Sequence, residues 1–318
     1  MSASIYSCSI IFLSVFLEAL PFVLIGTIVS SLIEVFVSRD MIEKIGGRGV
    51  FSYLLMGLAG MVFPVCECAI VPIVRRLLRK GMPIGLALTF MLSVPIVNPI
   101  VLLSTYYAFP GDLFYPLMRG ISGYIIAVVI GLFMNRRISR EEVVGHEEIH
   151  RREISSVLVP LLSLHEEGCE CEHCSDLNKR RGMKEVLRSI LDHTSAELYT
   201  SGRYLILGVL IASLMQVYVP KKALFQVGTH PVLGISALMI FAFVLSLCSE
   251  ADAFVAATFR GIFSPVAVLG FMVLGPMIDI KNILMLSRVF EKKALIKLVV
   301  MVSSLCFIFM FILGFFAV

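Results

Sequence analysis

Apolar residues fall in long blocks along this chain, separated by shorter polar segments. A helical block of about 20 apolar residues is long enough to cross a lipid bilayer. Eight blocks of this kind are predicted to be helical, at roughly 10–37, 50–74, 83–109, 116–134, 198–219, 231–259, 264–287 and 294–317. The pattern therefore predicts an all-α membrane protein with about eight transmembrane helices.

A polar stretch rich in Arg, Glu and His interrupts this pattern after the fourth block, from about Asn135 onward. We expect three parts: a first transmembrane repeat at 1–134, a polar central loop at 135–195 and a second transmembrane repeat at 196–318.

The two transmembrane parts resemble each other in sequence. Phe22–Val37 aligns without gaps with Tyr204–Val219, at an offset of 182 residues. Two further pairs of segments align in the same order: 66–69 with 248–251 and, after a one-residue gap, 90–98 with 271–279. Ordered matches at nearly one offset indicate an internal duplication, as many transporters have.

The relation between the repeats depends on how many times each half crosses the bilayer. Four complete spans in each half give parallel repeats, related by an axis along the membrane normal. If Phe63–Val74 instead belongs to a re-entrant pair of half-helices, each half has an odd number of crossings and the repeats are inverted.

Composition agrees with a membrane location. Hydrophobic residues make up 58% of the 318 residues, charged residues 16%, and the mean hydropathy is +0.94. Soluble domains carry about 25% charged residues. The net charge of +4 gives no reason to expect a nucleic-acid partner.

Lys and Arg concentrate in the second connecting loop and in the central loop. Because cytoplasmic loops carry an excess of these residues, we expect the central loop to be cytoplasmic. With four spans in each half, both termini lie on that side too. A smaller group between Lys281 and Lys297 falls on the other side, so the bias is incomplete.

The most distinctive segment for chemistry runs from Phe63 to Pro72 and contains Cys66, Glu67 and Cys68 between two prolines. Proline breaks the helical hydrogen-bond ladder, and a carboxylate at membrane depth is costly unless it is partnered or functional. Cysteine adds soft sulfur ligands. The segment predicts a substrate or ion site in an unwound helix. The alternative is a proline kink in which Glu67 pairs with a basic residue such as Arg75.

The second half repeats this feature at 247–253, where Cys248, Glu250 and Asp252 interrupt an apolar run. We expect these side chains to contribute to the same site. The alternative is a loop at the membrane edge with its acids in water.

A further matched pair places Asn98 and Asp279 next to prolines in the middle of apolar blocks. Unwound carbonyls and these side chains are suited to coordinating a cation or polar substrate. Alternatively, Asp279 forms a structural bridge with Lys281 or Arg288. Glu18 and Glu34 in the first block are weaker candidates.

The central loop contains Cys169, Cys171, His173 and Cys174 within six residues. Three thiols and an imidazole can bind Zn²⁺ or Cu⁺, which predicts a flexible metal-capture loop. The alternative is a solvated acidic loop with incidental cysteines.

Enzymatic chemistry is not indicated. The sequence has no P-loop GxxxxGK[ST] motif and no nucleophile elbow, so we expect neither a built-in ATPase nor a hydrolase.

Four segments of the chain resemble motifs of the bacterial predicted-permease family. These segments are Pro64–Gly81, Pro95–Leu102, Ser246–Phe254 and Gly275–Asp279. That family includes the organoarsenical efflux permeases. The resemblance covers nearly the whole chain except the central loop. It implies a multi-pass permease of the bacterial inner membrane, and its arsenical-exporting branch makes a thiophilic cargo attractive.

Together these observations predict a secondary permease for a small metal or metalloid species. The predicted site lies near the bilayer midplane and comprises Cys66, Glu67, Cys68, Asn98, Cys248, Glu250, Asp252 and Asp279. Expected partners are the lipid bilayer, the substrate, and a second copy or an accessory membrane subunit. The rival interpretations are a channel-like subunit of a larger complex and a membrane-embedded metal sensor or chaperone.

Overall fold

The computed structural model describes residues 2–37, 42, 49–63, 65–137, 183–218, 231–287 and 289–316. In these ranges the chain is helical, with no strand beyond one isolated bridge between Arg260 and Phe263. The helices of the first half are α1 (Ser2–Phe36), α3 (Val50–Gly57), the 3-10 helix η1 (Leu58–Met61), α4 (Glu67–Arg79), α5 (Ile84–Val97), α6 (Pro99–Ala108) and α7 (Phe114–Arg137). Those of the second half are α9 (Met183–Tyr218), α11 (Pro231–Leu245), α12 (Asp252–Ala257), α13 (Pro265–Met277), α14 (Ile280–Leu286) and α15 (Lys292–Phe316).

Eight apolar helical segments correspond to the eight predicted blocks. Within the described residues, five are long and apolar enough to cross a membrane: Tyr6–Ile33, Ile84–Ala108, Phe114–Arg137, Pro265–Leu286 and Lys292–Phe316. Three are shorter: Val50–Met61, Ser201–Val217 and Val232–Leu245. The prediction of an all-α membrane protein is confirmed.

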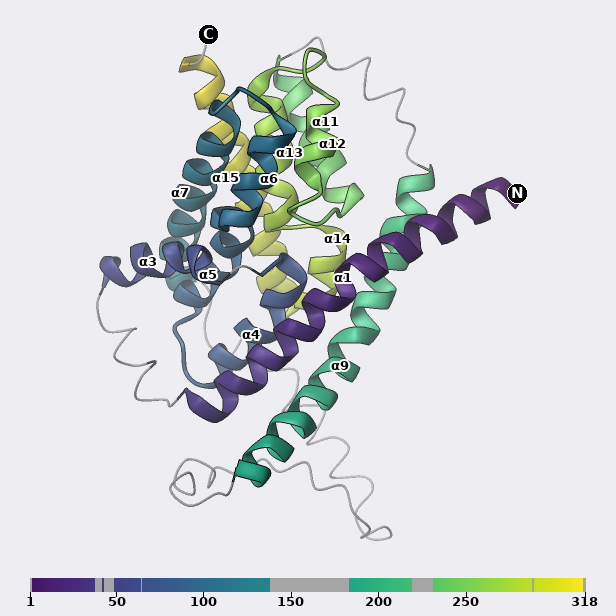
Figure 1. Ribbon diagram of the computed structural model, residues 1–318. Coiled ribbons are helices and arrows are strands. Elements are labelled where there is room, and N and C mark those ends of the chain that lie inside the picture. Colours follow the sequence, from purple (N-terminus) through teal and green to yellow (C-terminus); the bar gives the residue numbers. More distant parts are fainter. Residues whose placement is uncertain are drawn as a thin grey trace.

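The centre of the molecule is formed by the corresponding helices of the two halves, α5 and α13. Their apolar segments are 78% and 89% buried, whereas those of α1 and α15 are only 17% and 22% buried. Figure 1 shows α1 and α9 side by side along one flank, with α5, α7, α13 and α15 packed together beyond them. The exposed apolar faces of the outer helices are therefore suited to contact with lipid.

The elements of the two halves follow the same order. In each half a long helix comes first, then a helix that ends in a non-helical segment, a short return helix, a helix interrupted at Asn98 or Asp279, and a final long helix. α5 starts at Ile84 and α13 at Pro265, an offset of 181 residues that nearly equals the offset found in the sequence. The duplicated sequence thus corresponds to duplicated secondary structure.

The first helices of the two halves run in opposite directions. Cys8 near the start of α1 lies 3.5 Å from Ser213 near the end of α9, measured from Sγ to Oγ. At the other end, Thr194 near the start of α9 donates to the Ser31 hydroxyl of α1 at 2.9 Å. Equivalent helices with opposite directions mean that the repeats are inverted, which decides between the two relations that the sequence left open.

The second apolar block of each half turns back instead of crossing. α3 runs alongside α5 in the same direction, because Tyr53 lies against Gly85 and Gly60 against Val94. α4 then returns along α1: Ser30 donates to the Pro72 carbonyl at 3.2 Å, and Lys80 donates to the Val37 carbonyl at 2.7 Å.

The second half shows the same arrangement. α11 runs in the direction of α13, because Met239 lies against Gly270 and Ala242 against Gly275. The short return helix α12 then connects through residues 258–264 to the start of α13. We call residues 50–79 and 231–257 the first and second hairpins.

The two hairpins determine how many times each half passes through the molecule. Because the hairpins do not cross, the first half passes through the molecule three times, with α1, α5–α6 and α7. The start of α1 and the end of α15 therefore lie at the end opposite to the start of α9, as Figure 1 shows. Each half therefore has an odd number of passes.

The non-helical segment of the first hairpin is shorter than predicted. Cys66 has an extended conformation, but α4 begins at Glu67 and includes Pro72. A proline removes one helical hydrogen bond, and the close packing of α4 on α1 offsets that loss. In the second hairpin, the non-helical residues are 246–251.

Candidate functional site

Several helices begin inside the protein instead of at its surface. Asn98 caps α6 by accepting a hydrogen bond from the Ile100 amide at 3.0 Å, and Asp279 caps α14 by accepting one from the Asn282 amide at 2.6 Å. Both side chains are fully buried. The proline motifs thus place polar residues at interior helix starts, where a cap satisfies an otherwise unpaired backbone amide.

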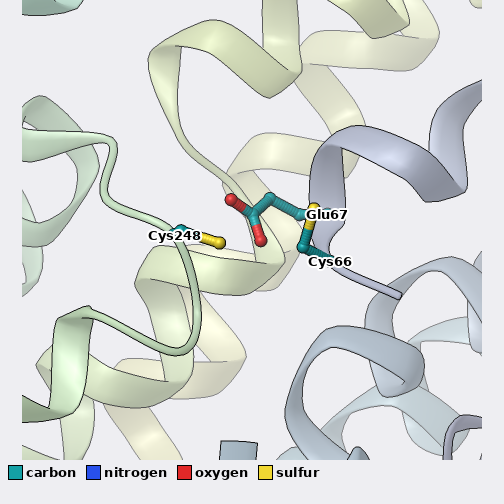
Figure 2. A group of neighbouring side chains, drawn as sticks. All are labelled: Cys66, Glu67 and Cys248. Carbon is teal, nitrogen blue, oxygen red and sulfur yellow. The ribbon is translucent and has the colours of Figure 1, made fainter. Parts of the chain in front are cut away.

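The tips of the two hairpins meet in a cluster of thiols and a carboxylate. Cys66 and Glu67 stand at the start of α4, and Cys248 lies in the non-helical segment after α11. One ligand atom from each of the three residues lies within 4.8 Å of the other two, and all three residues are buried. Figure 2 shows the Glu67 carboxylate extending from α4 toward Cys248. Two soft sulfur atoms and one hard oxygen atom from opposite halves therefore converge.

Neighbouring polar groups connect to this cluster. Cys248 donates to Glu250 Oε2 at 2.7 Å, and Ser249 donates to the same oxygen at 3.3 Å. The Cys68 thiol is directed at Glu67 Oε1 at 3.9 Å. Both hairpin tips thus pair thiols with carboxylates, as the aligned motifs predict.

The cation that pairs with Glu67 is Lys281, from the opposite half. Lys281 Nζ lies 2.8 Å from Glu67 Oε1 and 3.3 Å from Asp279 Oδ2. It also donates to the Ser246 carbonyl at 3.0 Å. The proposed bridge between Asp279 and Lys281 therefore exists, but it is part of a larger network that includes the predicted site. Arg288, the other partner considered for Asp279, lies outside the described residues.

A second buried ion pair joins the halves, between Asp252 of α12 and Arg119 of α7. Arg119 Nη2 lies 2.8 Å from Asp252 Oδ2, with side chains 0% and 4% exposed. Arg119 also donates to the Thr105 hydroxyl at 2.8 Å and to the Ser249 carbonyl at 3.1 Å. Asp252 is thus buried, as predicted, but its contacts are with Arg119 and not with the thiol cluster.

Sequence reasoning missed Arg119, and it considered Lys281 only as a structural partner of an acid such as Asp279. Arg119 sits in the apolar block 116–134, and an ionisable residue at that depth is a signal for a functional or structural partner. Lys281 was assigned to a basic loop cluster because Lys292, Lys293 and Lys297 follow it. Its position only two residues after Asp279 pointed to the bridge with Asp279, but no local signal pointed to its contact with Glu67.

The predicted residues fall into three groups. Cys66, Glu67, Cys68, Cys248, Glu250 and Asp279 belong to the network around Lys281 and the thiols. Asp252 belongs to the Arg119 pair. Asn98 caps α6, and its Nδ2 has no hydrogen-bond partner within the described ranges. Cys169, Cys171, His173 and Cys174 lie outside the described residues.

Two glycines at repeat-related positions allow the helices to approach each other beside the Glu67–Lys281 pair. A Cβ atom on Gly26 would lie 2.6 Å from the Ala69 carbonyl oxygen, and one on Gly208 would lie 2.9 Å from Lys281 Cα. Both distances are too short for a real side chain. α1 and α9 therefore pack directly on the helix starts that carry Glu67 and Lys281.

Comparisons with known proteins agree with this architecture. A family model described as "Predicted permease" matches residues 5–315. A protein of Streptococcus mutans serotype c, named as a subunit of a two-component membrane permease complex, is 34% identical over 315 residues, covering 99% of this chain and 97% of its own. UPF0718 protein YcgR of Bacillus subtilis is 39% identical over 284 residues, covering 89% of this chain and 88% of its own.

A shorter similarity extends to UPF0718 protein YraQ of Escherichia coli, 27% identical over 125 residues, covering 38% of this chain and 35% of its own. No solved structure matches the chain.

Proposed function

Because this chain belongs to the predicted-permease family and is a multi-pass membrane permease, we propose that its cargo is a small thiophilic metal or metalloid species. The observation that carries the proposal is the convergence of Cys66, Glu67 and Cys248 within 4.8 Å at the contact between the halves. Thiolates select soft metals and metalloids over hard cations such as Mg²⁺. A carboxylate between them supplies negative charge to balance the cargo.

The origin of these ligands supports a transport mechanism. Cys66 and Glu67 belong to the first hairpin and Cys248 to the second. Alternating access in inverted repeats moves one repeat against the other around a fixed site. Such a movement changes the separation of Cys66 from Cys248, so binding and release follow from the same motion.

We further propose that transport is secondary and directed outward. The sequence has no nucleotide-binding motif, and we propose an ion gradient as the energy source. Glu67 and Glu250 at the thiols are the residues placed to carry coupling protons, because carboxylates inside membranes commonly form proton relays.

We propose an orientation in the membrane from the distribution of the basic residues. Many described basic residues gather at the end where α4 and α7 finish and α15 starts: Arg75, Arg76, Arg79, Lys80, Arg136, Arg137, Lys292, Lys293 and Lys297. Arg260 lies at the opposite end, between α12 and α13. By the positive-inside rule the first end faces the cytoplasm of a bacterial inner membrane. The central loop is then cytoplasmic, while the start of α1 and the end of α15 face outward.

A flux assay tests the proposed cargo site. Full-length protein in proteoliposomes is supplied with Cd²⁺ or arsenite as probe cargo, with and without a pH gradient. We expect Cys66→Ser combined with Cys248→Ser to lower the initial flux by about tenfold or more, since loss of ligands costs at least as much as loss of their supporting partners. Glu67→Gln should have a similar effect.

Cys306→Ser is the matched control for this assay. Cys306 is also fully buried, but it lies in α15 beside Met277. It should transport like the wild type. Equal flux in the wild type and the Cys66/Cys248 double variant, at equal membrane abundance, rules out the proposed site.

A second candidate function is that of one subunit in a permease complex. The specific observation is the name of the Streptococcus mutans relative, a subunit of a two-component membrane permease complex. If this chain acts in the same way, the purified chain alone should show no flux, whereas membranes that also contain its partner subunit should transport. Flux by the purified chain alone contradicts this candidate.

Metal capture by the central loop stays a separate proposal. Cys169, Cys171, His173 and Cys174 supply the donors that bind Zn²⁺ or Cu⁺. Replacing these three cysteines by serine should lower the Zn²⁺ stoichiometry of the full-length protein without abolishing flux. An unchanged stoichiometry contradicts metal capture by the loop.

A further inference from the structure

The ammonium group of Lys281 is surrounded by oxygen atoms in the manner of a bound cation. Its Nζ lies 2.8 Å from Glu67 Oε1, 3.3 Å from Asp279 Oδ2 and 3.0 Å from the Ser246 carbonyl oxygen. The Leu247 carbonyl oxygen is 3.5 Å away. Lys281 itself is only 1% exposed. Two carboxylates and two backbone carbonyls from both halves therefore hold one positive charge.

The two carbonyls come from a backbone segment that is held in an uncommon conformation. Ser246 has a φ of +50°, in the left-handed region that residues other than glycine seldom adopt. Strain of this kind persists only where the surrounding structure maintains it, and it clusters at functional sites. The segment presents the Ser246 and Leu247 carbonyls to Lys281 at the hairpin tip that also carries Cys248.

The surroundings contain more negative than positive groups. Glu67 and Asp279 both contact Lys281, and Glu18 of α1 lies within electrostatic reach of Glu67, Glu250 and Lys281. The second carboxylate oxygen of Glu67, Oε2, is buried and has no hydrogen-bond partner among the described residues. A buried carboxylate oxygen without a partner is costly, so this region is suited to receive a further cation.

Glu67 is shared between the two sites. Its Oε1 accepts the Lys281 ammonium, and its carboxylate lies within 4.8 Å of the Cys66 and Cys248 thiols. Two positive charges on either side of one carboxylate repel each other strongly where water is excluded. A cation bound to the thiols and an ammonium bound to Glu67 therefore oppose each other.

We propose that Lys281 is a tethered counter-cation that competes with the transported species for Glu67. Without cargo, the ammonium neutralises Glu67 and keeps the hairpin tips together. When cargo binds to Cys66, Glu67 and Cys248, the two thiols release their protons, and the ammonium shifts toward Asp279 and the two carbonyls. This inference rests on the proposed function and adds a reason why cargo can leave: a site for transport has to bind weakly enough to release.

The test measures Cd²⁺ binding to full-length protein in lipid nanodiscs, with Cys169, Cys171 and Cys174 replaced by serine in every sample to remove the loop thiols. Ultraviolet absorbance reports thiolate–Cd²⁺ bonds. Lys281→Met removes the charge at similar length and should bind Cd²⁺ at least about tenfold more tightly than the parent protein. Lys281→Arg keeps the charge and should stay close to the parent affinity.

The outcomes separate this inference from the proposed function. If Cd²⁺ binding requires Cys66 and Cys248 but is equally tight in Lys281→Met and the parent protein, Lys281 does not compete with the cargo. The proposed thiophilic site is then retained. Absence of a signal that depends on these two cysteines overturns both.

A measurement on the parent protein covers the case in which Lys281→Met does not fold. Saturation with Cd²⁺ should increase acetylation of Lys281 by a small anhydride, detected by mass spectrometry, while exposed Lys292 reacts equally in both states. Unchanged reactivity of Lys281 contradicts its displacement.

Discussion

Two buried ion pairs cross between the halves, and they differ in the number of carboxylates that contact the cation. Arg119 meets Asp252, Thr105 and the Ser249 carbonyl through its fixed guanidinium fork. Lys281 is a compact charge between two carboxylates, and one of these carboxylates also lies beside the Cys66 and Cys248 thiols. Arginine is suited to rigid, multidentate pairing, whereas lysine presents a more mobile point charge.

The difference indicates that the two pairs have different tasks, although both join the return helix of one hairpin to the opposite half. The Asp252–Arg119 pair braces the second hairpin against α7. The Glu67–Lys281 pair lies where ligands for a soft cation converge, so its lysine can be replaced by another cation. Four changes test this distinction, in order of decreasing effect.

The largest effect is expected from Arg119→Met. Removing one partner of a buried pair leaves Asp252 uncompensated, which should lower the free energy of unfolding by about 3–5 kcal/mol. Denaturant titration of the purified protein measures this loss. Combining Arg119→Met with Asp252→Asn should restore part of it, because no buried charge is then left alone.

Lys281→Met provides the contrast. This change should also destabilise the protein. Cd²⁺ at about 100 times the dissociation constant of the variant should then raise its free energy of unfolding by about 2.7 kcal/mol, because Cd²⁺ binds the folded state. Cd²⁺ should not rescue Arg119→Met to any greater extent than it stabilises the wild type. If Cd²⁺ raises the free energy of unfolding of both variants equally relative to the wild type, the two pairs do not have different roles.

A smaller effect is expected from Gly208→Ala. The added methyl group would meet Lys281 Cα at 2.9 Å, so α9 has to move away from the start of α14. Overpacking of this kind costs about 1–3 kcal/mol and should weaken Cd²⁺ binding together with stability. Gly202→Ala is the control, because a Cβ at that position of the same helix would meet no atom within 4 Å. Similar results for the two variants contradict close packing at Gly208.

The smallest effect is expected from Asp112→Asn. Asp112 pairs with Arg260 of the other half at 3.2 Å, but the side chains are 30% and 50% exposed. Exposed pairs contribute about 0–1 kcal/mol, so the change should alter stability by less than about 1 kcal/mol. A loss comparable to that of Arg119→Met shows that contact between the halves, and not burial, sets the strength of these pairs.

The apolar blocks and the duplicated motifs were readable from the sequence, because block length and composition follow from the thickness and chemistry of a bilayer. The direction of the second block in each half was not readable. Residues 50–74 are long enough to cross, and only the packing of α4 along α1 shows that the chain returns. One turn in each half changes the parity and therefore the position of both termini.

The candidate site was predicted unevenly for a similar reason. Cys66, Glu67, Cys248 and Glu250 were found because their motifs stand out in an apolar background and repeat. The pairing of Glu67 with Lys281 and that of Asp252 with Arg119 were not assigned, because the partners are 214 and 133 residues apart. Pairing over such separations is set by the inverted packing of the halves, which local patterns do not contain.

The contact between α1 and α9 has a consequence for the ancestry of the protein. Ser31 and Ser213 occupy equivalent positions at the offset of 182, and each hydroxyl contacts the opposite helix. Contacts that recur reciprocally are the signature of a two-fold homodimer interface. A single ancestral half would form this interface with a second copy of itself inserted upside down in the same membrane. The present chain therefore has the architecture of a fused dual-topology dimer, whose two-fold axis lies in the plane of the bilayer.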